Sequence, residues 1–168
     1  MKLILALTLL LSGNTFAEER AEVAKSFMKA LQKELMTGMK KGPKAGLIHC
    51  NDKAIPVTNS FNNDKYEVGR VSLKLRNPSN APSDDLKKVL SKYSSSSAKS
   101  PMEAKVIVLS NNEEVFVKPL YMKGACLNCH GANIQSGVKS ELQKRYPDDK
   151  AVGYKLGEFR GLVWVKKK

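Results

Sequence analysis

The chain has 168 residues, of which 42% are hydrophobic and 27% are charged, so it can bury the core of one domain but not of several. It carries 29 lysines and arginines against 16 aspartates and glutamates, a formal net charge of +13. The three cysteines and two histidines exclude a disulfide framework as the basis of the fold, and they exclude any site that needs more than two imidazoles.

The first residues are predicted to be a secretory signal peptide. Lys2 precedes a mainly apolar run over residues 3–11, and small residues lead to Ala17, as in a leader with its cleavage site. The run is shorter than the roughly 20 apolar residues that a membrane span needs. We therefore expect cleavage after Ala17, with residues 1–17 as the leader. Residues 18–168 are then a single periplasmic domain without stable membrane insertion.

The exported domain stays strongly basic, because Lys2 is the only charged residue of the leader. A basic protein outside the cytoplasm does not normally meet nucleic acid, so we expect no nucleic-acid partner. Its charge is suited to attracting an acidic redox or signalling protein. The alternative is a lysine surface that only keeps the protein in solution.

Two helices are predicted at the start of the mature chain. Between residues 18 and about 41, apolar residues recur every four positions, the pattern of an amphipathic helix. A glycine then ends this helix, and Pro43 is well placed in the first turn of a second one. Pro56 is expected to disturb the second helix. Before that point, the second helix places three residues on one stripe: Leu47, Cys50 and Ala54.

The middle of the chain is predicted to be extended and then irregular. Residues 66–75 have an extended pattern, and residues 76–82 form a loop punctuated by prolines. Ser83 is expected to cap a short helix that ends near Lys92. The serine-rich stretch 91–101 lacks an apolar period and is predicted to be an exposed loop.

The last third of the chain has the pattern of strands. Residues 105–109 and 115–120 are β-rich and flank a turn, which predicts a hairpin. A helix is expected over 138–146, and the glycines and β-rich residues within 153–165 suggest a second hairpin. Early helices followed by strands indicate the α+β class, with an antiparallel sheet.

Residues 126–130, Cys-Leu-Asn-Cys-His, match the attachment pattern of c-type haem. Two thiols three positions apart can each form a thioether with one vinyl group of the porphyrin, and the imidazole of His130 then reaches the iron from the same side. The spacing therefore predicts one covalent haem c on Cys126 and Cys129. The alternatives are a redox dithiol, a structural pair, and a zinc site completed by Cys50 or His49.

Few residues are candidates for the sixth position on the iron. They are Cys50, His49 and a methionine, and the position can also stay open. Neighbouring residues on a helix point about 100° apart, so Cys50 and His49 cannot both face one iron. We favour Cys50, because small residues flank it on its stripe and let a flat macrocycle approach. The ordinary alternative is that Cys50 is a small buried apolar residue.

Three arginines are candidates for contacts with the haem propionates. A guanidinium can donate two parallel hydrogen bonds to a carboxylate. Arg70, Arg76 and Arg160 are the candidates, and the alternative is that each is a surface or loop-stabilising residue.

Several motifs together resemble the family of exported single-haem c-type domains with a PAS-like fold. They are Gly42-Pro43, Ile48-His49-Cys50, the string from Val68 to Pro82, Cys126 to Gly131, Tyr146-Pro147-Asp148, Gly153-Tyr154 and Phe159-Arg160-Gly161. The resemblance implies a twisted antiparallel sheet flanked by the N-terminal helices, with haem between sheet and helices. It also implies His130 and Cys50 as the two axial ligands, and a domain that often serves as an extracytoplasmic sensor.

Two functions follow from this ligand set. A thiolate on iron favours the ferric state and lowers the reduction potential, and release of Cys50 on reduction would open the site to CO or NO. That predicts a redox or gas sensor. The alternative is a periplasmic electron carrier whose ligands never change. An enzyme such as a peroxidase would need further acid and base groups, so we expect no enzymatic activity.

Overall fold

The computed structural model describes residues 11–168, and the exposure of side chains from Phe16 onward. Residues 1–10, which hold most of the predicted signal peptide, lie outside the described residues. Within the described part, no helix combines the length and the apolar character that crossing a membrane requires.

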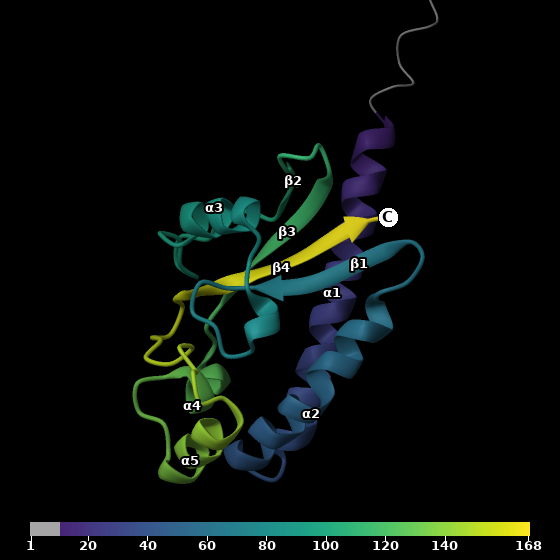
Figure 1. Cartoon of the computed structure of the whole chain (residues 1–168). Helices are drawn as coiled ribbons and strands as arrows, with labels where there is room; N and C mark the ends of the chain where they lie inside the picture. The colour runs from purple at the N-terminus through teal and green to yellow at the C-terminus, as the bar shows by residue number, and fades with distance from the viewer. Residues whose placement is uncertain (1–10) are drawn as a thin grey trace, which may run out of the picture.

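Two N-terminal helices pack side by side against one face of the sheet (Figure 1). They are α1 (Leu11–Met39) and α2 (Pro43–Phe61). Gly42 joins them with φ of 94°, a left-handed conformation that glycine adopts without strain. The helices approach closely, because a Cβ added at Gly38 would lie 2.9 Å from the Cα of Gly46. The two predicted helices are confirmed.

Pro56 was expected to disturb α2, but it does not end the helix. The helix continues five residues further, to Phe61. Proline removes one backbone donor, but its fixed φ suits a helix. Val57 and Phe61 then pack against the core of the sheet, which stabilises the last turn.

A four-stranded antiparallel sheet forms the centre of the molecule. Its strands are β1 (Tyr66–Val71), β2 (Lys105–Val108), β3 (Glu114–Tyr121) and β4 (Phe159–Lys167), in the spatial order β1-β4-β3-β2. The hairpin of β2 and β3 and the α+β class are as predicted.

The predicted C-terminal hairpin is wrong, because β4 is a single strand between β1 and β3. The residues before β4 do not pair with it. Instead, the N–H of Gly153 donates to the carbonyl of Gly131, and the N–H of Tyr154 donates to the carbonyl of His130. The segment expected to form the first strand of a hairpin therefore holds the Cys-x-x-Cys-His segment.

Each face of the sheet buries its own apolar cluster. Phe27 of α1 is fully buried on one face, where its ring lies 5.4 Å from that of Phe61. The helix α3 (Asp84–Tyr93) covers the other face with Leu90 and Tyr93. Ser83 caps α3 as predicted, by accepting a hydrogen bond from the N–H of Leu86.

Short elements gather at one end of the sheet, beside α2 (Figure 1). They are η1 (Pro78–Asn80), η2 (Gly124–Cys126), α4 (Leu127–His130) and α5 (Ser136–Arg145). Val138 and Leu142 of α5 form a small core with Leu47 of α2. This core joins α2 to the segment that follows the Cys-x-x-Cys-His motif.

Replacing Phe27 by alanine tests the contact between α1 and the sheet. Removing a fully buried phenylalanine leaves a cavity, so we expect the free energy of unfolding to fall by about 3–5 kcal/mol. Urea unfolding followed by circular dichroism measures this. Met36→Ala is the matched control, because Met36 lies on the same helix and is 50% exposed. We expect it to change stability by less than about 0.5 kcal/mol. Equal losses in the two variants would contradict the packing described here.

Candidate functional site

The Cys-x-x-Cys-His motif occupies a short turn between β3 and α5. Cys126 ends η2, and Cys129 and His130 form the end of α4. Cys126 packs against the cluster that contains Met122 and Ala151, whereas Cys129 packs against the small core that α2 and α5 form. Both thiols are free and partly buried. The turn therefore presents two reduced cysteines beside one imidazole.

Hydrogen bonds select one tautomer of His130. Its Nδ1 lies 2.6 Å from the carbonyl oxygen of Ala151, which can only accept a hydrogen bond, so Nδ1 carries the proton. Its Nε2 lies 3.4 Å from Nη1 of Arg76, which can only donate. The lone pair of His130 is therefore on Nε2, and the carbonyl fixes the orientation of the ring.

His130 is neutral at physiological pH. Burial, followed by the positive charges of Arg76 and Arg160, lowers its pKa from 6.5 to about 3. Arg70 contributes the smallest part of this shift among the three arginines. A neutral imidazole with a free Nε2 lone pair is the form that binds metal ions.

Arg76 joins the motif to the segment that precedes β4. Its Nε donates to Oδ2 of Asp149 at 3.0 Å, and its Nη2 donates to the carbonyl oxygen of Cys129. The side chains of Arg76 and Asp149 are only 11% and 8% exposed. The N–H of Ala151 also donates to Asp149, at 2.8 Å. This buried pair therefore holds in place the carbonyl that orients His130.

Arg160 also lies beside Tyr154. Its Nη1 donates to Oγ of Ser72 and to the carbonyl oxygen of Lys74, and its guanidinium lies 5.5 Å from the centre of the Tyr154 ring. Burial lowers the pKa of Arg160. No acidic side chain pairs with Arg160 among the described residues, so its charge is not compensated there.

Cys50 lies on α2, about one turn after Leu47 of the small core against which Cys129 packs, and it is close enough to Cys129 for that thiol to affect its pKa. Burial raises the pKa of the Cys50 thiol, Cys129 raises it further, and Arg70 partly offsets both effects. Cys50 is therefore a neutral thiol at physiological pH. Its helix stripe faces the motif.

His49 points toward the other N-terminal helix. Its Nε2 lies 2.6 Å from Oε2 of Glu34 on α1. The structure thus separates the two neighbours, with Cys50 toward the motif and His49 toward α1. For the zinc alternative, residues 11–168 contain no group of three or more His, Cys, Asp or Glu side chains that could hold a metal ion.

Sequence reasoning missed Asp149 and Ala151, and it did not single out Met122 among the methionine candidates. Asp149 and Ala151 contribute through an ion pair and a backbone carbonyl, and neither belongs to a recognisable pattern of residue types. Met122 was one of several methionines without a distinguishing signal, but it is 3% exposed and packs beside Cys126. Arg70 also differs from its two counterparts, because it stands on the edge strand β1, and its charge acts on Cys50 as well as on His130.

Replacing Arg76 by alanine tests the buried pair. Because Asp149 would be left as an unpaired buried carboxylate, we expect the free energy of unfolding to fall by about 3–5 kcal/mol. Chemical denaturation measures this loss. Lys25→Ala removes the exposed pair with Glu22, whose side chains are 72% and 64% exposed, and should change stability by less than about 1 kcal/mol. A loss for Arg76→Ala no larger than this control would contradict the role given to the pair.

Comparison with known proteins places the chain in a family. The crystal structure of the cyanobacterial heme-protein Tll0287 resembles it with a TM-score of 0.62 and 22% sequence identity, covering 87% of this chain and 90% of that chain. At this identity, the likeness shows a shared fold. No curated protein matches the chain. The model of the Tll0287-like family matches residues 12–167, and the chain therefore belongs to the Tll0287-like family.

Proposed function

We propose that this chain is an exported c-type haem protein that senses redox state or a diatomic gas. One haem is attached through Cys126 and Cys129, and its iron is bound by His130 and Cys50. The proposal rests on the tautomer and the protonation of His130. Its imidazole is neutral, its Nε2 lone pair is free of a proton, and two free thiols stand beside it on the same turn.

The donors of this chain fit a haem. Two thiols at Cys-x-x-Cys spacing suit thioether attachment, and the hydrogen bond from Nδ1 to Ala151 is the usual support of a metal-binding histidine. Binding through Nε2 would replace its contact with Arg76. A bound haem would supply an iron centre that changes oxidation state or takes up a diatomic gas. The structurally similar protein Tll0287 is itself a heme-protein, which supports the same cofactor here.

The fold we propose for the holoprotein is PAS-like, with haem between the sheet and the helices. Cys50 on α2 is the second axial ligand, because α2 directs it toward the motif while His49 contacts Glu34. A thiolate ligand would favour the ferric state. Since Cys50 is a neutral thiol without haem, coordination requires it to lose its proton.

The three arginines have different roles toward the propionates. Arg160 is the best candidate, since it lies near His130 and has no acidic partner among the described residues. Arg76 already pairs with Asp149 and is better described as a residue that positions His130. Arg70 lies at the edge of the sheet and affects His130 least.

The position of the packed residues on α1 supports the proposed export to the periplasm. The described apolar residues of α1 that pack against the core of the sheet start at Ala21, beyond the expected cleavage after Ala17. Cleavage would remove one contact with the sheet, that of the Phe16 ring with Nζ of Lys167 at 4.5 Å. Glu19 pairs with Lys65, and Arg20 pairs with Glu114. Cleavage would therefore leave these contacts of the mature domain intact.

Electron transfer without sensing is the second candidate function. The net charge of +13 favours it, because a basic surface accelerates association with an acidic redox protein. We propose no enzymatic activity. The spare imidazole, His49, pairs with Glu34 on α1 rather than with a residue of the motif.

Substitution of Cys50 tests the ligand set. In the oxidised Cys50→Ala holoprotein we expect the optical and paramagnetic resonance spectra to lose the signature of a thiolate ligand, because alanine has no donor atom. The mass should still include one haem. His49→Ala is the matched neighbour control and should keep the wild-type spectra. Unchanged spectra in Cys50→Ala, or a colourless wild-type protein, would contradict the proposal.

Reduction in the presence of CO separates the sensor from the electron carrier. If Cys50 is released on reduction, the ferrous protein should bind CO and its absorption bands should shift. A carrier with fixed ligands should show the same reduced spectrum with and without CO. An unchanged spectrum would leave electron transfer as the function.

A further inference from the structure

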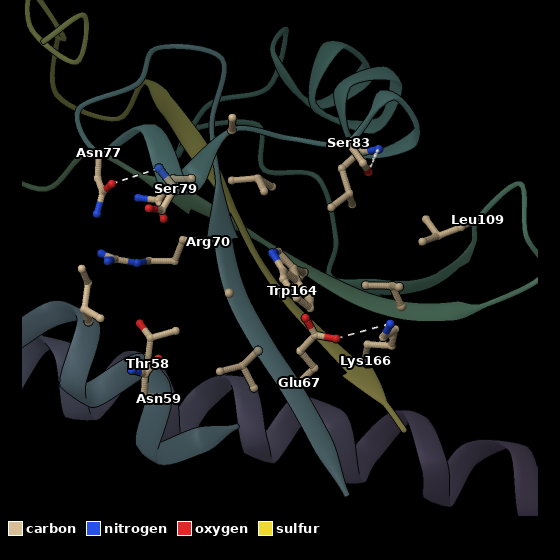
Figure 2. Close-up of a pocket in the computed structure, with 18 of the residues that line it drawn as sticks. Thr58, Asn59, Glu67, Arg70, Asn77, Ser79, Ser83, Leu109, Trp164 and Lys166 are labelled. Atoms are coloured by element: carbon tan, nitrogen blue, oxygen red, sulfur yellow. Dashed lines mark hydrogen bonds and ion pairs between the residues drawn. The ribbon is translucent and has the colours of Figure 1, made fainter. Parts of the chain in front are cut away.

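A cavity of about 490 Å³ follows the free edge of β1 and extends over both faces of the sheet. Neighbouring residues of a strand stand on opposite faces. Arg70 pairs with Val163 of the apolar cluster under α1 and therefore faces the helices. Figure 2 shows Arg70 on one side of β1, and Trp164 and Lys166 on the other. We call this second side, which α3 partly covers, the outer groove. It is lined by Glu67, Leu86, Glu113, Val115, Trp164 and Lys166.

The indole of Trp164 forms the floor of the outer groove. Trp164 on β4 pairs with Gly69 on β1, and it packs in the apolar cluster under α3. A Cβ added at Gly69 would lie 2.6 Å from Cε2 and Cζ2 of the indole and 2.7 Å from Nε1. The ring therefore lies across β1 where glycine leaves room for it, and its other face is turned away from the sheet. Because Trp164 is partly exposed, this second ring face is open to a ligand.

Two carboxylates and one ammonium group stand beside the indole. Nζ of Lys166 lies 3.3 Å from an oxygen of Glu67 and 3.3 Å from an oxygen of Glu113. Glu67 and Lys166 form the cross-strand pair that follows the pair of Gly69 and Trp164 on the same face, so they are neighbours of the ring. The side chains of Glu67 and Glu113 are 41% and 44% exposed. This group of three therefore keeps one excess negative charge that a ligand can reach.

Apolar side chains form the remaining wall of the outer groove. Leu86 of α3 and Val115 of β3 line it, and both belong to the same cluster as Trp164. These side chains form no hydrogen bonds, and Lys166 already contacts both carboxylates. The groove therefore suits a positive charge that is covered by apolar groups rather than one that carries several N–H donors. An ammonium group with methyl substituents has this character, and the face of a tryptophan ring attracts it.

We infer that the outer groove binds a small organic cation with a methylated ammonium head. The head lies on the open face of the Trp164 indole, and Glu67 and Glu113 balance its charge. The net charge of +13 does not prevent this, because salt at physiological strength screens charges beyond about 8 Å. None of the three cysteines and neither histidine lines the cavity, so the inference does not rest on the proposed haem function.

Choline is the probe, titrated by calorimetry into the purified protein. We expect saturable binding of one choline per chain. The neutral analogue 3,3-dimethylbutan-1-ol has the same shape, with carbon in place of the ammonium nitrogen. It should bind about tenfold more weakly, since it loses the attraction to the ring and to the carboxylates. Equal affinities for the two compounds, or no saturable binding of choline, would overturn the inference.

The same ammonium head occurs in a lipid, so vesicles of phosphatidylcholine are tested separately by sedimentation. We expect the protein to remain in the supernatant, because the phosphate beside a lipid head group would be repelled by Glu67 and Glu113. Sedimentation with the vesicles in place of binding to free choline would show that the ligand is not a small solute.

Three substitutions assign the site, and circular dichroism checks that each variant folds. Trp164→Leu keeps an apolar side chain but removes the ring, so it should weaken choline about tenfold. Glu67→Gln should weaken it several-fold. Lys166→Gln should strengthen it several-fold, because it removes a competing cation, whereas damage to the fold would only weaken binding. Glu22→Gln is the matched control, since Glu22 pairs with Lys25 on α1 outside the cavity, and it should bind as the wild type does. A Lys166→Gln variant that binds choline no more tightly than this control would contradict the inference.

Discussion

The candidate site depends on the hydrogen bond from Nδ1 of His130 to the carbonyl of Ala151. That bond fixes the tautomer and leaves the Nε2 lone pair free to bind a metal. The carbonyl is itself held in place, because Asp149 accepts from the N–H of Ala151 and pairs with the buried Arg76. Without this support, the imidazole of His130 would have no fixed direction.

Uncompensated positive charge is the second constraint on this region. Arg76 and Arg160 lie close enough to His130 to lower its pKa together with burial. Only Arg76 has an acidic partner among the described residues. A buried guanidinium without a counter-ion is costly, so a region of this kind favours an anionic ligand. The proposed propionate contact of Arg160 has this physical origin.

The segment between α5 and β4 connects the fold to the site. Its backbone binds the motif through Gly153 and Tyr154, and its continuation, β4, is the central strand between β1 and β3. One continuous segment therefore links the motif to the inner part of the sheet.

The sequence by itself determined the elements and residues that depend on local patterns. The helical period predicted α1 and α2, strand alternation predicted the β2–β3 hairpin, and the Cys-x-x-Cys-His spacing identified residues 126–130. The 100° step of a helix also predicted that Cys50 and His49 face different directions. Only the tertiary structure decided which contacts distant segments make. It showed that β4 lies in the middle of the sheet, that Pro56 is tolerated in α2, and that Arg70, Arg76 and Arg160 differ. These features depend on which backbone donors, carboxylates and apolar surfaces are brought together in the folded chain, and local periodicity carries no information about those partners.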